Sequence, residues 1–120
     1  MDEVDKSFLG TSYAKFELAL KGINTFETEK SLQFELLTKS LKKIAVTNAL
    51  MTNHKTTKND VEYNYNFWEH KIPEGEYDFL ICTCFEDLEG NMIDNGWFIF
   101  PKKLLEEIGA KNTISIFESD

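Results

Sequence analysis

Carboxylate side chains are the reactive groups that dominate one part of this sequence. Residues 60–98 contain ten acids and a single basic residue, Lys71. Eight of these acids flank the most apolar stretch of the chain: Glu69, Glu74, Glu76, Asp78, Glu86, Asp87, Glu89 and Asp94. Turns at one end of a sheet could gather them into a surface that competes with nucleic acid for a basic groove on another protein. The simpler interpretation is that the same acids keep the protein soluble.

The basic residues gather in a different segment. Residues 36–59 contain five lysines and no acid: Lys39, Lys42, Lys43, Lys55 and Lys58. Such a series could follow the phosphates of a single-stranded nucleic acid. It is more typical of a solvated hairpin, whose lysines discourage pairing with the edge of another sheet.

The charge of the whole chain argues against sequence-specific reading of DNA. The 120 residues carry a net charge of −8, and all 13 basic residues are lysine. Arginine makes the usual bidentate contacts with phosphate and guanine, and negative charge opposes binding to nucleic acid in general. We therefore expect a protein partner, such as a nucleic-acid-binding enzyme, in preference to nucleic acid itself.

Cysteine and histidine do not form a pattern typical of metal sites. Cys82 and Cys84 are two residues apart in a strand-like run, and neither His54 nor His70 has a second ligand at a suitable spacing. Because buried free cysteine behaves as a small apolar residue, we expect a packed core pair. Reduced thiols, an acidic N-terminus and the lack of an apolar run of roughly 18 residues indicate a cytoplasmic protein that does not span a membrane.

The size and the hydrophobic patterning predict one mixed α/β (α+β) domain over residues 1–120. We expect a helix at 5–21 with Phe8, Tyr13, Phe16 and Leu20 on its apolar face. The other expected elements are strands at 31–38, 43–48, 61–69, 77–85, 96–100 and 113–117, a helix at 101–108, and a loop or frayed strand end at 51–60. Since 77–85 is apolar on both faces, we expect a mixed central sheet that is covered on both sides. Trp68 and Trp97 are expected to anchor the core.

The order of these elements resembles the PD-(D/E)XK restriction-endonuclease-like superfamily. Within it, Asp78–Ile81 and Gly96–Leu104 resemble the DFLI-type strand and the G-x-F-x-FPK segment of MepB-like proteins. The likeness covers the last third of the chain in detail and the remainder in outline. None of the matching residues is catalytic in that superfamily, so the resemblance implies a fold and leaves the activity open.

The catalytic residues of the superfamily are only partly matched. The resemblance implies one carboxylate and, on the next strand, an acid-x-Lys pair that holds Mg²⁺ and positions water. Glu35 stands where the first acid belongs, but residues 43–47 supply no acid for the pair. We therefore expect no catalytic residue, no metal and no cofactor. Glu17 and Glu62 are the acids that could replace the missing one, in which case Mg²⁺ would be the cofactor.

Two functions remain open from the sequence. The first is a non-catalytic acidic binding protein on a degenerate nuclease-like scaffold. It would inhibit or modulate a nucleic-acid-handling protein, such as a defence or restriction nuclease, by mimicking nucleic acid. The alternative is a small metal-dependent nuclease, or a single-stranded nucleic-acid-binding protein that uses the lysines of residues 36–59. Exposed strand edges and many aromatic residues leave room for a homodimer.

Overall fold

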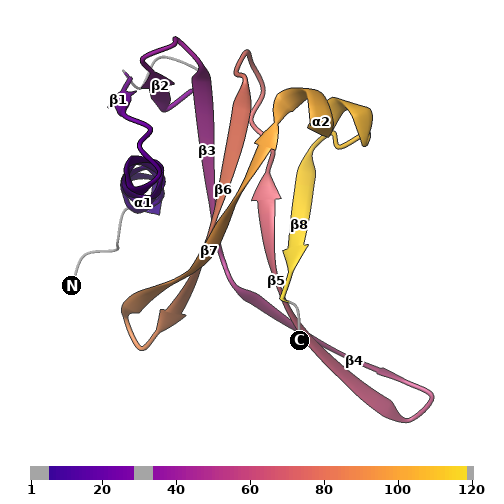
Figure 1. Ribbon diagram of the computed structural model, residues 1–120. Coiled ribbons are helices and arrows are strands. Elements are labelled where there is room, and N and C mark those ends of the chain that lie inside the picture. The colour runs from indigo at the N-terminus through magenta and orange to yellow at the C-terminus, as the bar shows by residue number, and fades with distance from the viewer. Residues whose placement is uncertain (1–5, 29–33, 119–120) are drawn as a thin grey trace.

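The computed structural model describes residues 6–28 and 34–118, and within them it shows a mixed α+β fold with two sheets and two helices (Figure 1). The N-terminal helix is α1 (Lys6–Leu20), and the short C-terminal helix is α2 (Lys102–Glu107). A five-stranded sheet has the order β1-β2-β3-β6-β7, and a three-stranded sheet has the order β4-β5-β8. The strands are β1 (Thr25–Glu27), β2 (Leu36–Thr38), β3 (Lys43–Leu50), β4 (Thr52–Lys58), β5 (Val61–Lys71), β6 (Phe79–Leu88), β7 (Asn91–Pro101) and β8 (Thr113–Phe117).

The five-stranded sheet is mixed because β3 and β6 run parallel, while its other neighbours are antiparallel. The parallel register extends from Ile44 opposite Phe79 to Leu50 opposite Phe85. Parallel strands need a long crossover connection, which is usually a helix. Here the connection is made by β4 and β5, which form most of the second sheet.

Strand β6 is covered on both faces, as the sequence predicted. On one face, Ile81 packs in a cluster with Leu18 of α1. On the other face, Leu80 packs with Leu105 of α2, and Ile116 of β8 borders that cluster. Residues 80–85 are all buried, so the central strand is enclosed by α1 on one side and by α2 and the three-stranded sheet on the other.

Helix α1 faces the sheet with small residues. Gly10, Ala14 and Leu18 are four residues apart, so they share one side of the helix, and all three are buried. A Cβ atom on Gly10 would lie 1.3 Å from Oδ1 of Asn48 on β3. Glycine at this position therefore lets the helix approach β3 closely enough for Ala14 to be fully buried.

The predicted apolar face of this helix was wrong in most of its members. Phe8, Phe16 and Leu20 are 69%, 60% and 67% exposed, and Tyr13 is half-buried. Hydrophobicity alone favoured the large side chains. Close packing against β3 favours the side of the helix with the smallest ones.

The predicted loop at 51–60 is strand β4, which pairs with β5 from Thr52 opposite Phe67 to Lys58 opposite Val61. Asn59 and Asp60 close this hairpin with positive φ angles of 54° and 62°, as expected for a two-residue type I′ turn. Every residue of β4 is exposed. No apolar alternation marks such a strand, which is why its sequence resembled a loop.

Other predicted boundaries shift in smaller ways. The turn between the strands predicted at 77–85 and 96–100 falls at Glu89-Gly90, so the second of these strands extends over the whole of β7. Gly96, with a φ angle of 108°, lies at an irregularity in the pairing of β7 with β6.

The remaining elements fall near their predicted places. The helix at 101–108 and the strands at 43–48 and 113–117 are confirmed as α2, β3 and β8. Of the strand predicted at 31–38, residues 36–38 are confirmed, and residues 31–33 lie outside the described residues. The expected single central sheet is two sheets, and β1 was not predicted.

Candidate functional site

The acids predicted to form one surface are divided between the two ends of β6. Glu74, Glu76 and Asp78 precede the strand, whereas Glu86, Asp87, Glu89 and Asp94 surround its far end in the hairpin with β7. Glu69 lies on β5, opposite Ser115 of β8. A ten-residue strand is about 30 Å long, so the two groups of acids are separated by nearly that distance.

Where β6 begins, acids and lysines are mixed. One carboxylate oxygen of Asp78 accepts a hydrogen bond from the backbone N–H of Lys43 at 2.8 Å, which ties this acid to the parallel pairing of β3 and β6. The Lys102 ammonium group lies 4.7 Å from the centre of the Tyr77 ring and donates to the carbonyl of Gly75. Asp78 therefore has a structural contact, and this end of the sheet is not a purely acidic surface.

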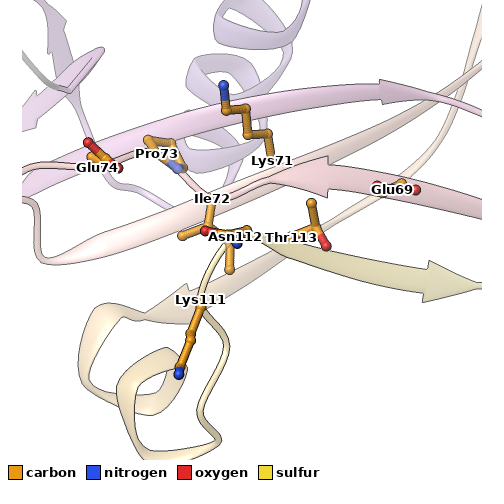
Figure 2. A pocket seen from close by; sticks show the side chains of 8 residues that line it. All are labelled: Glu69, Lys71, Ile72, Pro73, Glu74, Lys111, Asn112 and Thr113. Atoms are coloured by element: carbon orange, nitrogen blue, oxygen red, sulfur yellow. The ribbon is translucent and has the colours of Figure 1, made fainter.

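A groove of about 740 Å³ lies beside this mixed end, between the loop that follows β5 and the loop that precedes β8. Figure 2 shows its eight lining residues: Glu69, Lys71, Ile72, Pro73, Glu74, Lys111, Asn112 and Thr113. The side chains of Lys71 and Lys111 extend in opposite directions, and Glu69 and Glu74 lie at opposite ends of the view. The charged groups do not converge on a common point, so the groove is not built to hold a small charged ligand.

The opposite end of β6 carries a concentrated acidic surface. We define the acidic tip as the six residues Glu86, Asp87, Leu88, Glu89, Ile93 and Asp94. The tip contains four carboxylates, and residues 72–101 contain no basic residue. Its turn is well specified, since Glu89 and Gly90 have φ angles of 53° and 88°, and Asp87 accepts the backbone N–H of Gly90 at 2.9 Å.

The two faces of the acidic tip differ in composition. Glu86 is paired with Ile93, and Leu88 lies two residues further along, so these three side chains share one face. Leu88 is 48% exposed and Ile93 is 42% exposed. If these acids served solubility alone, exposed apolar side chains would not be expected beside them. Protein-binding surfaces typically have an apolar centre and a polar or charged rim, and Leu88 and Ile93 surrounded by carboxylates match that arrangement.

The other face of the tip is joined to α1. Tyr13 donates a hydrogen bond to Asp94 at 3.4 Å, and its ring packs edge-on against Phe85 with a centroid distance of 5.5 Å. Burial, followed by the negative charges of Asp94 and Glu17, raises the pKa of Tyr13 to about 12. Glu17 therefore adds a fifth carboxylate to this end of the molecule. Sequence reasoning missed this contribution because only the packing of α1 against β6 reveals it.

The three acids considered for catalysis lie on different elements. Glu35 precedes β2, and its carboxylate accepts the backbone N–H of Val46 at 2.7 Å. Burial raises the pKa of Glu35, and the hydrogen bond from Val46 opposes that shift. Glu17 belongs to α1, and Glu62 lies on β5 opposite Thr57. Over residues 6–28 and 34–118, no three His, Cys, Asp or Glu residues are grouped so that they could hold a metal ion.

The five lysines proposed to follow phosphates do not form one series. Lys39 and Lys42 lie between β2 and β3, and Lys43 begins β3. Lys55 and Lys58 lie on β4, which follows the opposite end of β3 (Figure 1). The structure therefore separates them into two groups by the length of β3.

The cysteines and His70 belong to the core, as predicted for the cysteines. Both thiols are buried, and burial raises the pKa to about 12 for Cys82 and to about 11 for Cys84. Cys84 Sγ lies 3.6 Å from Nε2 of His70, which is fully buried. Nδ1 of His70 has no hydrogen-bond partner within the described part of the chain. Trp68 is confirmed as a core anchor, since its indole N–H donates to the Phe85 carbonyl at 3.0 Å.

No family model, no curated protein and no solved structure matches this chain. Among the residues that the structure describes, neither helix is long and apolar enough to cross a membrane. The geometry of the molecule is therefore the basis for a functional proposal.

Proposed function

We propose that this chain is a non-catalytic binding protein whose acidic tip docks on a basic surface of a protein that handles nucleic acid. The observation that supports this most is the composition of the tip, where four carboxylates and two exposed apolar side chains occupy one hairpin. Glu17 and Asp94 both act on Tyr13, so Glu17 extends the negative field onto α1. A partner with a basic groove would be attracted by that field, and its nucleic acid would be displaced.

The proposed scaffold is a catalytically degenerate form of the restriction-endonuclease-like fold. The resemblance of Asp78–Ile81 and Gly96–Leu104 supports it, as does the helix followed by the antiparallel strands β1, β2 and β3. In the resemblance, Glu35 corresponds to the first catalytic acid; its carboxylate accepts a backbone hydrogen bond that links it to β3. On this proposal, a former catalytic position has become a structural one.

The chemistry of the tip favours a protein over a free cation or a small ligand as the partner. Carboxylates at a surface attract a basic protein over long range, and this attraction mainly increases the association rate. Leu88 and Ile93 offer apolar area that only a close-fitting surface can bury. The proposed partner therefore presents lysine or arginine side chains around an apolar contact.

A competition experiment tests this function. A fluorescent DNA duplex is bound to each of a panel of restriction and defence nucleases in the absence of the catalytic metal, and this chain is titrated in while anisotropy is recorded. We expect displacement of the duplex from at least one nuclease. The variant E86Q/D87N/E89Q/D94N should compete at least tenfold less well, because it removes the charges of the tip.

A matched control separates the tip from the net charge. The variant E27Q/E74Q/E106Q/E107Q removes the same number of charges from exposed positions outside the tip. It should compete within about threefold of the wild type, since distant surface charges are largely screened at physiological salt. If both variants compete equally poorly, the competition depends on net charge and not on the tip. If the wild-type chain displaces no duplex from any nuclease, the proposed function is wrong.

A further inference from the structure

The outer face of the three-stranded sheet is lined by exposed aromatic and aliphatic side chains. The register of β4, β5 and β8 places six of them on the side that faces away from the buried residues Trp68 and His70. We call this set the aromatic face: His54, Val61, Tyr63, Tyr65, Phe67 and Phe117. Val61, Tyr63, Tyr65 and Phe117 are 51%, 49%, 42% and 60% exposed. The alternation of residues 61–67 in the sequence puts Val61, Tyr63, Tyr65 and Phe67 on one face of a strand, but it cannot show that this face lacks a cover.

Tyr65 is the centre of the aromatic face. Its ring centroid lies 5.1 Å from that of His54, 5.9 Å from that of Phe67 and 5.9 Å from that of Phe117. Phe67 and Phe117 are also 5.9 Å apart. Aromatic side chains that hold one another in place lose little conformational freedom on binding, which favours a role as contact residues.

The aromatic face continues onto a hairpin that extends away from the rest of the molecule. We call residues 52–66 the arm. In Figure 1, β4 and the first half of β5 project beyond the five-stranded sheet. Every residue of β4 is exposed, and so are residues 61–65 of β5. The opposite face of the arm is polar, since Asn53 donates hydrogen bonds to Asn64 and Asn66. The arm is therefore two-faced, with an apolar side suited to contact and a polar side suited to water.

The charge of this surface allows two copies to approach each other. The chain carries −8, so two copies repel over most of their surface. The outer face of the sheet carries only Lys58, Glu69 and Lys71, two positive charges and one negative. Tyr65 lies midway along β5 between Val61, which is paired with Lys58, and Glu69. A two-fold axis beside Tyr65, perpendicular to the strands, would bring Lys58 of each copy within side-chain reach of Glu69 of the other.

The exposed apolar area supplies about half of what a dimer interface of standard size buries. From the exposed fractions of Val61, Tyr63, Tyr65 and Phe117, these four side chains present roughly 400 Å² of mainly apolar surface per copy. An interface of standard size buries about 800 Å² per partner. The polar side chains beside them on β4 and β8, which are also exposed, can supply the remainder as a rim.

We propose that the chain forms a homodimer in which the aromatic faces of two copies pack against each other, sheet on sheet, around Tyr65. The two sheets lie about 10 Å apart, as in other sheet packings. Tyr63, Tyr65 and Phe117 form the centre of the interface, and Lys58 and Glu69 form ion pairs at its margin. The acidic tip lies on the other sheet and is free to bind its own partner in each copy.

Sedimentation equilibrium of the purified full chain tests the dimer. The wild type should sediment at twice its chain mass of 13.9 kDa. The variant Y63S/Y65S should sediment as a monomer, with a dissociation constant raised at least 100-fold. The control variant F16S/L20S removes two comparably exposed apolar residues from α1 and should leave the dimer unchanged. Circular dichroism of each variant checks that it is folded.

A charge exchange tests the geometry of the interface. K58E alone and E69K alone should each weaken the dimer about threefold to tenfold, and the double variant K58E/E69K should recover most of the loss. A general effect of charge would not produce this recovery. The tip variant E86Q/D87N/E89Q/D94N should dimerise normally, so failure of the dimer and failure of the proposed function remain distinguishable.

Three outcomes would overturn the dimer. The first is a wild-type chain that remains a monomer at about 1 mM. The second is a dimer that Y63S/Y65S does not weaken. The third is binding of a labelled oligo(dT) strand that Y63S/Y65S abolishes while the wild type stays monomeric, which would show that the aromatic face stacks nucleotide bases.

Discussion

The enclosed strand β6 and the projecting arm are both extended β structure, yet they have opposite surroundings. Residues 80–85 of β6 are buried between α1 and the second sheet, whereas β4 and residues 61–65 of β5 are exposed on both faces. Burial of apolar side chains is the main favourable term in folding. We therefore expect the residues packed around β6 to contribute most of the free energy of unfolding, and the arm to contribute little and to be available for association.

The comparison also separates the two kinds of exposed surface. The acidic tip is the continuation of β6 beyond the covered part of the sheet, and the aromatic face is the outer side of the strands that cover it. The acidic tip lies where β6 extends past its packing partners, and the aromatic face lies on the uncovered side of the second sheet. Charge dominates the first surface and aromatic area dominates the second, so the two suit different partners.

Leu80→Ala tests most strongly whether the packing around β6 provides most of the stability of the protein. Leu80 is fully buried against α2, and its truncation leaves a cavity that the surroundings fill only in part. We expect the free energy of unfolding to fall by about 2–5 kcal/mol. Urea denaturation followed by tryptophan fluorescence measures the change. Tyr63→Ala on the arm is the matched control and should cost less than about 1 kcal/mol at a protein concentration low enough to keep the chain monomeric. Similar losses in both variants would contradict the comparison.

The burial of His70 in the same core predicts that the protein loses stability as the pH is lowered. Burial lowers the pKa of His70 from 6.5 to about 4, because the charged ring would lose its hydration; the nearby Thr47 backbone offsets only part of that shift. Between these pH values the unfolded chain binds more protons than the folded chain, so stability falls as the pH decreases from 6.5 towards 4. The full effect is about 3 kcal/mol at most.

Unfolding curves recorded between pH 7 and pH 4 measure this dependence. His70→Phe should flatten it, while His54→Gln, which changes an exposed histidine on the arm, should leave it intact. An NMR titration of the wild type gives an independent measurement. A His70 ring that titrates near its ordinary pKa would show that the group is hydrated and would contradict its assignment to the core.

Shortening the arm should have the smallest effect on stability. Replacing residues 55–64 by Asn-Gly joins His54 to Tyr65 through a two-residue turn of the type that favours hairpins. Because the removed segment is exposed on both faces, the free energy of unfolding of the dilute, monomeric chain should change by less than about 1 kcal/mol. Thermal denaturation measures this. A loss comparable to that of Leu80→Ala would mean that the arm supports the core.

Several elements could be predicted because their signals are local. The apolar run of β6, Pro101 before α2 and the short alternation of β8 each depend on neighbouring residues alone. The burial of Cys82, Cys84 and Trp68 followed from residue type and strand context. Strand β4 had no such signal, since an exposed strand shows no apolar alternation.

The candidate site was predictable in composition and not in arrangement. The acids of residues 60–98 were evident, but their division between two ends of β6 depends on where the turns fall. The turn at Glu89-Gly90 starts β7 earlier than the strand predicted at 96–100 and leaves Leu88 and Ile93 exposed among carboxylates. The contribution of Glu17 required the docking of α1 against β6.

The sequence by itself determined the mixed α+β class, the enclosed central strand and the surplus of acids, because residue type and periodicity fix what each segment can bury. Tertiary structure decided which side of α1 meets the sheet, where the acids gather and which aromatic residues stay uncovered. These outcomes depend on close packing between segments distant in sequence. The contact between Gly10 and Asn48 illustrates the reason, since a single absent Cβ atom sets how closely the helix can approach the strand.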